Sequence, residues 1–376
     1  MTTVESRVGL RVTCPASTLS KALQAAARAV STRPVHPIMG NLLLAAGDGL
    51  TVTGTDINMT IQQTLRAQVE VRGTTTVSAR ILSELVASLP DVEVTLEMAE
   101  DGWLRVRAGG LDSKLNCLPA DEFPRAADAG GGVRIVAPGL LGAVNAAAYA
   151  VSKDEHRVAI CGLLLEIDEG MAALVATDGH RLAVHRLGAV QSALRQAQLI
   201  IPSRALIEAR RAFKDEAAVE ILVAEDQRRI TIDSPTATLE TLLVDGVYPR
   251  YRQAIPQRAD TTVRVARAEM VSAVRTVRAL HDRGDDLHGL RLSASGDSLK
   301  VSASTAEVGE AHVEVASHIA GQPGAVQLNA DYIKDTLDAV RSDEVELRLA
   351  GPNAPVVIVP AGGDGESLHV MMPIRS

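Results

Sequence analysis

The strongest constraint on the fold of this 376-residue chain is a threefold internal repeat. A helical apolar segment, a strand that opens on glycine and a second apolar strand follow one another three times. The glycines, Gly40, Gly162 and Gly289, are 122 and 127 residues apart. Several features that recur together at nearly equal spacing are far more specific than any one of them. The repeat predicts three domains of one kind, at 1–127, 128–258 and 259–376.

Each repeat contains two segments whose apolar residues recur at helical spacing. These segments are 19–30 and 80–89, then 140–151 and 203–214, then 267–280 and 331–341. Short alternating runs around them, such as 92–97 and 345–349, are typical of strands with one face in water. The expected fold class is α+β, with two helices packed on antiparallel sheets in every domain. Links rich in small or polar residues at 126–132 and 255–261 separate the repeats.

Composition limits the class of protein. Apolar residues make up 46% of the chain but aromatic residues only 2%, so the cores are expected to consist of Ala, Val, Leu and Ile. The three cysteines, Cys14, Cys117 and Cys161, are far apart, which indicates reduced thiols instead of a disulfide framework or a metal site. We therefore expect no metal and no cofactor. The sequence contains neither a signal peptide nor a membrane span, so a cytoplasmic protein without a membrane partner is expected.

Charge is distributed unevenly along the chain. The whole chain carries a net charge of −8, yet the six helical segments contain twelve basic and six acidic residues. Helices that carry the positive charge on one face of the sheets would form a basic lining on an acidic body. Ordinary solvated helix faces explain the same pattern. The scarcity of aromatic residues argues against stacking on single-stranded bases, so any contact with nucleic acid would be to phosphates.

The segment Ala176-Thr-Asp-Gly-His-Arg-Leu-Ala-Val184 allows three interpretations: a tight turn, a catalytic Asp/His pair, or one wall of a binding site. An acid/base pair of Asp178 and His180 has little support, because no nucleophile motif, phosphate loop or metal cluster accompanies it. The corresponding turns of the other repeats have Thr55-Asp56 and Ser304-Thr305 without a histidine. This favours a binding site specific to the middle domain, on a turn that Asp178 holds.

Several motifs resemble the bacterial DNA polymerase III beta subunits, the replicative sliding clamps, over essentially the whole chain. They are Asn41-Leu-Leu-Leu44 after Arg33-Pro34, Asp121-Glu-Phe-Pro124, Ala176–Ala183, Asp245-Gly-Val-Tyr-Pro-Arg-Tyr251 and Val370-Met-Met-Pro-Ile-Arg375. The resemblance implies a non-catalytic processivity subunit. Two chains would close head to tail as a homodimer into a ring that encircles double-stranded DNA without regard to sequence. In the cell such a ring would be cytoplasmic and associated with the nucleoid.

The resemblance also implies a groove for short linear motifs of the DNA polymerase III alpha subunit, the clamp loader, other polymerases and repair proteins. The implied groove residues are Arg157, Ile160, Thr177, Gly179, His180, Arg181, Leu182, Pro249, Asn329, Tyr332, Val370, Met371, Met372, Pro373, Ile374 and Arg375. Apolar members such as Leu182 and Met372 suit a pocket that adapts to different ligands. Polar members such as His180 and Asn329 suit an extended peptide backbone.

For DNA, the resemblance and the charged helices indicate a set of basic residues. They are Arg33, Arg80, Lys153, Arg157, Arg204 and Arg210. Arg157 belongs to both sets, and the sequence does not separate its two roles. At Val158-Ala159 and at Gln253-Ala254 the chain departs from the clamp pattern. Such departures fit ordinary lineage variation, or an accessory or inhibitor-resistant clamp paralogue.

Ring closure requires free sheet edges at both ends of the chain. Leu104-Arg-Val-Arg107 in the first repeat is basic, whereas Glu307 and Glu310 in the third are acidic. We expect these two edges to meet across the subunit interface with complementary charge.

Overall fold

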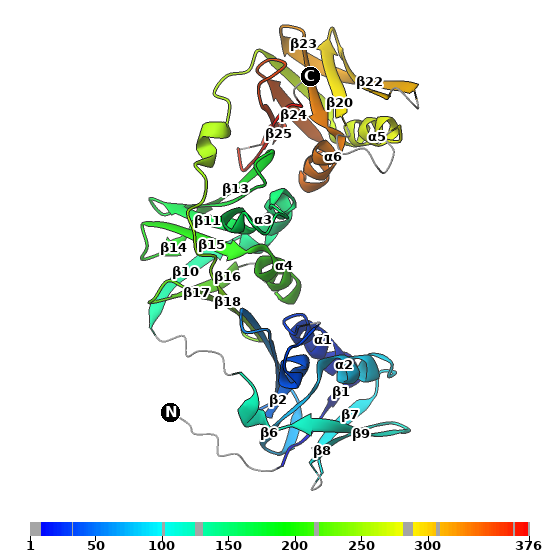
Figure 1. Cartoon of the computed structure of the whole chain (residues 1–376), viewed down its shortest axis with the longest axis vertical. Coiled ribbons are helices and arrows are strands. Elements are labelled where there is room, and N and C mark those ends of the chain that lie inside the picture. The colour runs from blue at the N-terminus through cyan, green and yellow to red at the C-terminus, as the bar shows by residue number, and fades with distance from the viewer. Residues whose placement is uncertain are drawn as a thin grey trace. The chain divides into compact units, whose positions relative to one another are not determined.

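The structure is a computed structural model that describes residues 9–31, 33–99, 102–124, 131–213, 218–280, 289–305, 309–363 and 365–374. The chain forms two compact units (Figure 1). The first comprises Met1–Val136 with Arg204–Leu243, and the second comprises Ala137–Ser203 with Val244–Ser376. The predicted link at 126–132 lies mostly outside the described residues.

The first unit is an extended antiparallel sheet with helices packed on it. Its elements are β1 (Arg11–Pro15), α1 (Ala16–Ala27), η1 (Pro37–Gly40), β2 (Asn41–Ala46), β3 (Leu50–Thr55), β4 (Met59–Leu65), β5 (Gln68–Val71), β6 (Gly73–Ser78), α2 (Ala79–Ala87), β7 (Glu93–Met98), β8 (Trp103–Ala108), β9 (Leu111–Leu118), η2 (Ala120–Glu122), β10 (Gly132–Pro138), α4 (Ser203–Ala212), β16 (Ala218–Ala224), β17 (Arg229–Asp233) and β18 (Ala237–Leu242). The strand order is β10-β16-β17-β18-β4-β3-β2-β6-β9-β8-β7-β1-β5. Helices α1 and α2 lie side by side (Figure 1).

The second unit repeats the arrangement with a 12-stranded sheet. Its elements are α3 (Leu140–Ala147), η3 (Ala148–Ala150), η4 (Val158–Ile160), β11 (Gly162–Asp168), β12 (Met171–Thr177), β13 (Arg181–Ala189), β14 (Gln191–Ser192), β15 (Gln196–Pro202), η5 (Tyr251–Ala254), β19 (Thr261–Ala266), α5 (Arg267–Arg278), β20 (Gly289–Ser295), β21 (Ser298–Thr305), β22 (Gly309–Gly321), β23 (Gly324–Asn329), α6 (Ala330–Ala339), β24 (Glu344–Leu349), β25 (Val356–Pro360) and β26 (Ser367–Met371). The order is β15-β11-β12-β13-β26-β25-β24-β19-β22-β21-β20-β23. The predicted α+β class is confirmed.

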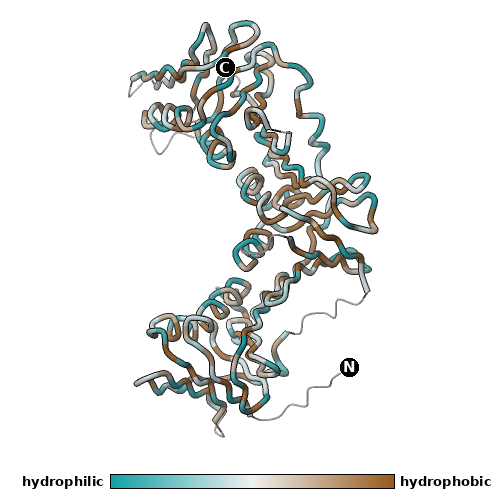
Figure 2. The backbone as a smooth tube through the Cα atoms, turned by 180° about the vertical axis from the view of Figure 1, so that it is seen from behind, coloured by the Kyte–Doolittle hydropathy of each residue, from teal (hydrophilic) through white to brown (hydrophobic). Residues whose placement is uncertain are grey.

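The helices cover the sheets through aliphatic stripes. In α1 the buried residues Leu19, Leu23 and Ala26 recur at helical spacing and pack into an aliphatic core with strand residues such as Leu42 and Val52. Figure 2 shows hydrophobic residues along the strands and on parts of the helices. The cores are built from Leu, Val, Ile and Ala, as the composition predicts. No helix within the described part of the chain is long and apolar enough to cross a membrane.

Several helices begin or end a few residues from the expected positions, and two of these differences have a visible structural cause. Helix α1 begins at Ala16, earlier than residue 19, because Pro15 occupies the N-cap with an extended backbone. Helix α3 ends at Ala147, and 148–150 form a short 3-10 turn from which Tyr149 reaches His369. Side-chain capping fixes the start of two helices. At α2 the Ser78 hydroxyl accepts a bond from the Ile81 N–H, and at α6 the Asn329 side chain accepts bonds from the N–H groups of Asp331 and Tyr332.

Strand pairing joins consecutive repeats in the same way twice. In the first unit β4 of the first repeat pairs with β18 of the second, with Thr60 opposite Glu240. In the second unit β13 of the second repeat pairs with β26 of the third, with Leu182 opposite Val370. Each joint extends the sheet of one repeat into the next, so the backbone hydrogen bonds of both edges are satisfied.

The predicted edge at Leu104–Arg107 is wrong. These residues lie in β8, which is hydrogen-bonded on both sides, to β7 and to β9. Residues 111–116 of β9 instead pair with β8 on one side and with no other described strand. A sequence pattern shows which residues alternate but not where a strand lies in the sheet order. Of the acidic pair, Glu310 lies on β22 and Glu307 lies outside the described residues.

Candidate functional site

The turn between β12 and β13 is held by side-chain bonds to its own backbone. The Asp178 carboxylate accepts bonds from the N–H groups of His180 and Arg181, both at 2.9 Å. The Thr177 hydroxyl donates to the carbonyl of Arg181 at 2.7 Å and accepts from the N–H of Gly179 at 3.0 Å. The prediction that Asp178 holds this turn is confirmed. Its carboxylate is occupied by these bonds and by the Arg181 guanidinium, so it does not activate the His180 ring.

The same turn occurs between β3 and β4 of the first repeat, bond for bond. Asp56 accepts from the N–H groups of Asn58 and Met59, and Thr55 accepts from the N–H of Ile57. The neighbouring strand in the sheet also corresponds in the two repeats. Leu242, at the end of β18, donates to the Asn58 carbonyl, as Met372, just after β26, donates to the His180 carbonyl. The repeats therefore share a backbone scaffold, and the side chains distinguish them.

One position of the two turns differs in kind. Gly179 has a left-handed backbone, with φ of 91°, and an added Cβ would lie 2.9 Å from the Arg157 guanidinium. At the equivalent position Ile57 has φ of 78° and is 66% exposed. A β-branched residue in this region is strained. Glycine in the middle repeat removes that strain and lets Arg157 lie across the turn, where its Nη1 donates to the Asp178 carbonyl at 2.8 Å.

Arg181 is not available at the surface of the site. Its guanidinium bonds Asp178 at 3.0 Å and Asp335 of α6 at 2.7 Å. It also lies over the rings of Tyr149 and Tyr332, 5.1 and 4.4 Å from their centroids. Cation–π contacts of this kind are strongest where water is excluded. Arg181 therefore ties the turn to α6, and its side chain supports the site from below.

A buried polar chain continues beneath Arg181. The Thr336 hydroxyl donates to the Tyr149 hydroxyl at 3.0 Å, so the Tyr149 proton is directed to Nδ1 of His369 at 2.9 Å. The neutral imidazole then carries its proton on Nε2, 2.7 Å from the Ser367 hydroxyl. Burial, with a smaller contribution from His185, lowers the pKa of His369 to about 4. Burial likewise raises the pKa of Tyr149, so both groups stay neutral.

The apolar floor predicted for the site is present but nearly covered. Ile160, Leu182 and Val370 belong to one buried cluster that Tyr248 and Tyr251 complete. Met372, the next outward residue, is 43% exposed. Met371 does not reach the surface, because alternation along β26 places its side chain in the core of the third repeat. A contact between the Met371 side chain and a ligand is therefore excluded in this conformation.

The last described residues of the chain border the floor. The Met372 N–H donates to the His180 carbonyl and the Ile374 N–H to the Gln327 carbonyl, both at 2.8 Å. Pro373 lies between these two bonds, and Arg375 lies outside the described residues. Asn329 uses its Oδ1 to cap α6, accepting from Asp331 and Tyr332. The exposed rim adds Pro249 and His180, whose ring centroid is 6.4 Å from that of Tyr332.

The basic residues of the helices are largely paired with acids. Arg204 bonds Asp56 and the Arg28 carbonyl, both at 2.6 Å, and Arg80 bonds Glu84 within α2. The pairs Arg211–Glu208, Arg278–Asp331 and Lys334–Asp338 are similar. Within the described residues Lys21, Arg210 and Arg275 have no ion-pair partner, and Arg33 and Lys153 are exposed on loops. The helices therefore carry less unpaired positive charge than the count of charges predicts.

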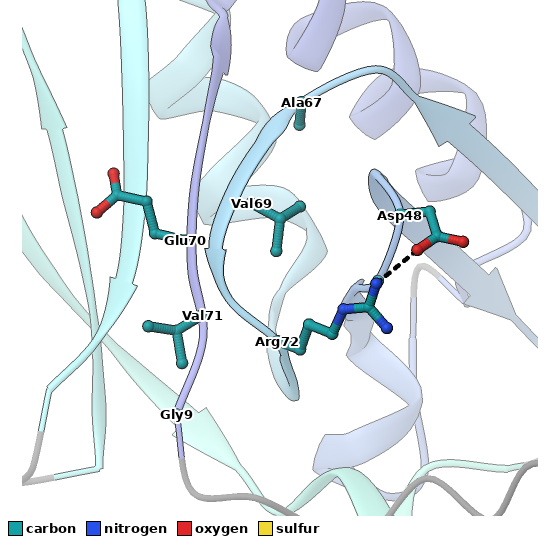
Figure 3. Close-up of a pocket in the computed structure, with 8 residues that line it drawn as sticks. Gly9, Asp48, Ala67, Val69, Glu70, Val71 and Arg72 are labelled. Atoms are coloured by element: carbon teal, nitrogen blue, oxygen red, sulfur yellow. Dashed lines mark hydrogen bonds and ion pairs between the residues drawn. The ribbon is translucent and has the colours of Figure 1, made fainter.

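A separate hollow of about 810 Å³ lies beside the edge strand β5 of the first unit. Figure 3 shows the Arg72–Asp48 ion pair across it, at 2.6 Å, with Val69 nearby. Both charged side chains are exposed, and an exposed pair contributes little energy. No group of side chains among the described residues has the composition of a metal site.

Four supporting residues of the site escape sequence reasoning. Tyr149, Asp335, Thr336 and His369 form no motif, because they come from η3, α6 and β26. The signal that does exist is weak: Tyr149 is one of only four tyrosines in a chain poor in aromatic residues.

The chain matches known domain families along almost its whole length. Residues 10–127, 137–250 and 252–375 match the N-terminal, central and C-terminal domains of the DNA polymerase III beta subunit. The beta sliding clamp of Pseudomonas aeruginosa is 30% identical over 362 residues, covering 95% of this chain and 97% of the relative. That of Caulobacter vibrioides is 30% identical over 378 residues, covering 97% of this chain and all of the relative.

Solved structures agree in fold. The P. aeruginosa DnaN sliding clamp, crystallised with griselimycin, superposes with a TM-score of 0.90 at 30% identity, covering 98% of this chain and 100% of that one. The Caulobacter crescentus beta sliding clamp, crystallised with polyethylene glycol, gives 0.90 at 29% identity, covering 99% and 100%.

Proposed function

The chain belongs to the DNA polymerase III beta subunit family, the bacterial sliding clamps, and on that premise we propose how it performs the clamp function. Two chains close head to tail into a ring of six domains around double-stranded DNA. The ring holds the DNA polymerase III alpha subunit, the clamp loader, other polymerases and repair proteins by their short linear motifs. It works in the cytoplasm at the nucleoid and has no catalytic step of its own.

The observation that carries the proposal is the strand joint that occurs twice within one chain. The strands β4 and β13 occupy equivalent places in their repeats and pair with the equivalent strands β18 and β26. The strand of the third repeat that is equivalent to β4 and β13 is β22, and the strand of the first repeat that is equivalent to β18 and β26 is β9. A head-to-tail partner supplies to each of these edges the same kind of strand that the other joints already have, and the ring closes.

The repeat also predicts the register of the third joint. In the sequence repeat Ser304 occupies the same place as Thr55 and Thr177. Thr60 pairs with Thr55, Leu182 with Thr177 and Glu310 with Ser304, so Glu310 is equivalent to Thr60 and Leu182. Counting back from the pairing of β9 with β6 makes Lys114 equivalent to Glu240 and Val370. Lys114 would then lie opposite the partner subunit's Glu310, an attractive cross-strand pair.

The groove is proposed to consist of the turn, the floor and the rim described above. Gly179, His180, Pro249, Met372, Pro373 and Ile374 would contact the peptide directly, with Arg157 and Tyr332 at the sides. Thr177, Arg181, Asn329 and the floor residues would hold that surface in place. An exposed methionine beside an apolar floor can adapt to different motifs. Because Arg157 bonds the turn, its groove role is better supported than its DNA role.

DNA is proposed to be held by diffuse attraction to phosphates. Arg33, Arg80, Lys153, Arg204 and Arg210 would face the duplex, with Lys21 and Arg275 added because they have no acidic partner in the described part of the chain. Without contacts to bases, every register along the duplex has nearly the same energy, so sliding has low barriers. Ring topology then keeps the protein on DNA.

Retention on DNA tests the clamp proposal. The protein is loaded onto a nicked circular duplex by a clamp loader and passed through a sizing column, before and after a single cut linearises the DNA. We expect retention on the circle and loss from the linear form. Equal retention on both would contradict topological binding.

A deletion tests the groove. Removal of residues 372–376 takes away the rim methionine and the bonds from the chain end to His180 and Gln327. We expect the alpha subunit to lose binding while the sedimentation coefficient of the dimer stays the same. Undiminished binding would place the partner site elsewhere on the chain.

A further inference from the structure

A large hollow of the second unit lies next to the groove. It measures about 950 Å³ and is lined by β23, by the loop after β24 and by Ile374. Ile374 is also the groove residue whose N–H bonds the Gln327 carbonyl of β23. The hollow and the groove therefore share a wall, and a chain that leaves the groove past Ile374 enters the hollow.

The wall of this hollow is β23, which lies at the edge of the sheet among the described strands. Strand β23 ends the 12-stranded sheet and pairs only with β20 among the described strands. In an antiparallel strand the N–H and C=O of one residue point to the same side, and alternate residues point oppositely. Because the Gln327 carbonyl is used by Ile374, Ala325 directs its N–H and C=O outward in the same way. An extended peptide can pair there as an added strand.

Charge selects the kind of peptide. Arg291 lies opposite Gln327 in the ladder, at the Ile374 end, and makes only a 3.4 Å contact to the Ser293 hydroxyl. No carboxylate of a described residue pairs with it. Asp260 lines the opposite end, near Gly324, roughly 10 Å further along the strand at the usual rise per residue. The first side chain of an entering segment thus meets a positive charge.

We propose that the peptide groove continues past Ile374 along the edge of β23, where it takes an extended acidic segment that flanks the partner's linear motif. This inference rests on the proposed function, since it concerns the same partners. The flank pairs with the Ala325 backbone, and an acidic side chain beside the motif bonds Arg291. It gives the clamp a means to rank partners whose motifs are alike.

The test measures the affinity of the full-length dimer for the DNA polymerase III alpha subunit of the same organism, without DNA. Ala325→Pro removes the outward donor without touching the β20 ladder, since proline is tolerated on such an edge. Arg291→Glu reverses the selecting charge. We expect each to weaken binding about fivefold to tenfold, the value of one hydrogen bond or one charged contact. The Arg291→Glu effect should shrink at high salt.

Two control variants separate the outcomes. Lys300→Glu makes the same charge change on the same sheet, outside the hollow, and should bind as wild type. Met372→Ala tests the groove itself. If Met372→Ala weakens binding but Ala325→Pro and Arg291→Glu do not, the extension is refuted and the groove stands. If Met372→Ala has no effect, the groove proposal fails, and the extension with it. A change in dimer mass caused by Ala325→Pro would show that a second copy occupies the edge, which also overturns the inference.

Discussion

At the scale of single residues, the two equivalent turns differ at one position with opposite consequences. Ile57 holds a left-handed backbone that costs a side chain of its type roughly 1–2 kcal/mol, whereas Gly179 holds it without strain. The apolar Ile57 side chain also lies mostly in water.

Exchange of these residues gives a paired prediction. Ile57→Gly should raise the free energy of unfolding by about 1 kcal/mol, because the relief of strain exceeds the entropy that glycine adds to the unfolded chain. Gly179→Ala should lower it by a similar amount or more, since the new Cβ meets Arg157 as well. Urea unfolding of both variants checks this. A destabilised Ile57→Gly would show that Ile57 makes a contact outside its turn.

His369 provides a pH prediction. Its pKa of about 4 in the folded chain lies below the ordinary 6.5, so the unfolded chain binds the proton first as pH falls. Stability should therefore decrease from pH 6.5 to about 4, by on the order of 3 kcal/mol, and change no further below that for this group. His369→Gln should flatten this part of the stability curve.

Sequence reasoning finds some of these residues and misses others for a physical reason. The role of Asp178 follows from local order, because its bonds go to residues two and three positions ahead. The bond between Tyr149 and His369 spans 220 residues and depends on the pairing of β26 of the third repeat with β13 of the second. No local pattern encodes such a contact.

At the scale of elements, α6 is fastened to the β12–β13 turn through one guanidinium. Arg181 satisfies Asp178 and Asp335 together and fills the space between two tyrosine rings. A planar fork can make both bonds while it stacks, whereas an ammonium group cannot.

Arg181→Ala should cost about 3–5 kcal/mol, since it leaves Asp178 partly buried without its counter-charge. Arg181→Lys should recover less than half of that loss. Chemical denaturation measures both, with Arg134→Ala as control, because its ion pair with Glu220 is exposed and should contribute under 1 kcal/mol. If Lys restores full stability, the stacking and the two-carboxylate geometry contribute nothing.

Helices and strands were predictable in kind, because apolar spacing follows directly from which face is buried. The order of strands was not: β8 has the alternation and charge of an edge strand, but it lies inside the sheet. Its arginines pair with Glu97 and Asp112 on neighbouring strands, so their charge is already balanced within the domain. The charge of one strand therefore does not show whether the strand contacts a partner subunit until its neighbouring strands in the sheet are known.

At the scale of the whole molecule, the proposed ring depends on the third strand joint. Lys114→Glu places like charges opposite each other at both interfaces of the dimer. At up to 1 kcal/mol for each cross-strand pair, the dissociation constant of the dimer should rise roughly tenfold.

The compensating exchange makes the prediction specific. Lys114→Glu combined with Glu310→Lys restores attraction in the predicted register, so sedimentation velocity should show the dimer recovered. If each single variant weakens the dimer and the double variant weakens it further, β9 and β22 do not pair in this register. If no variant changes the mass, these edges do not form the interface.

The bond-for-bond match of the two turns has a practical consequence for engineering. The first repeat already has the backbone of the turn that we propose to bind peptides, with the adjoining strand donating to Asn58 as Met372 donates to His180. Replacing residues 57–60 by Gly-His-Arg-Leu, together with an aspartate on the facing helix to pair with the new arginine, would build a second site of the kind proposed to bind peptides. In the proposed ring, a chain altered in this way would have two peptide-binding sites per subunit and four in total, so that one subunit could bind two different partner motifs.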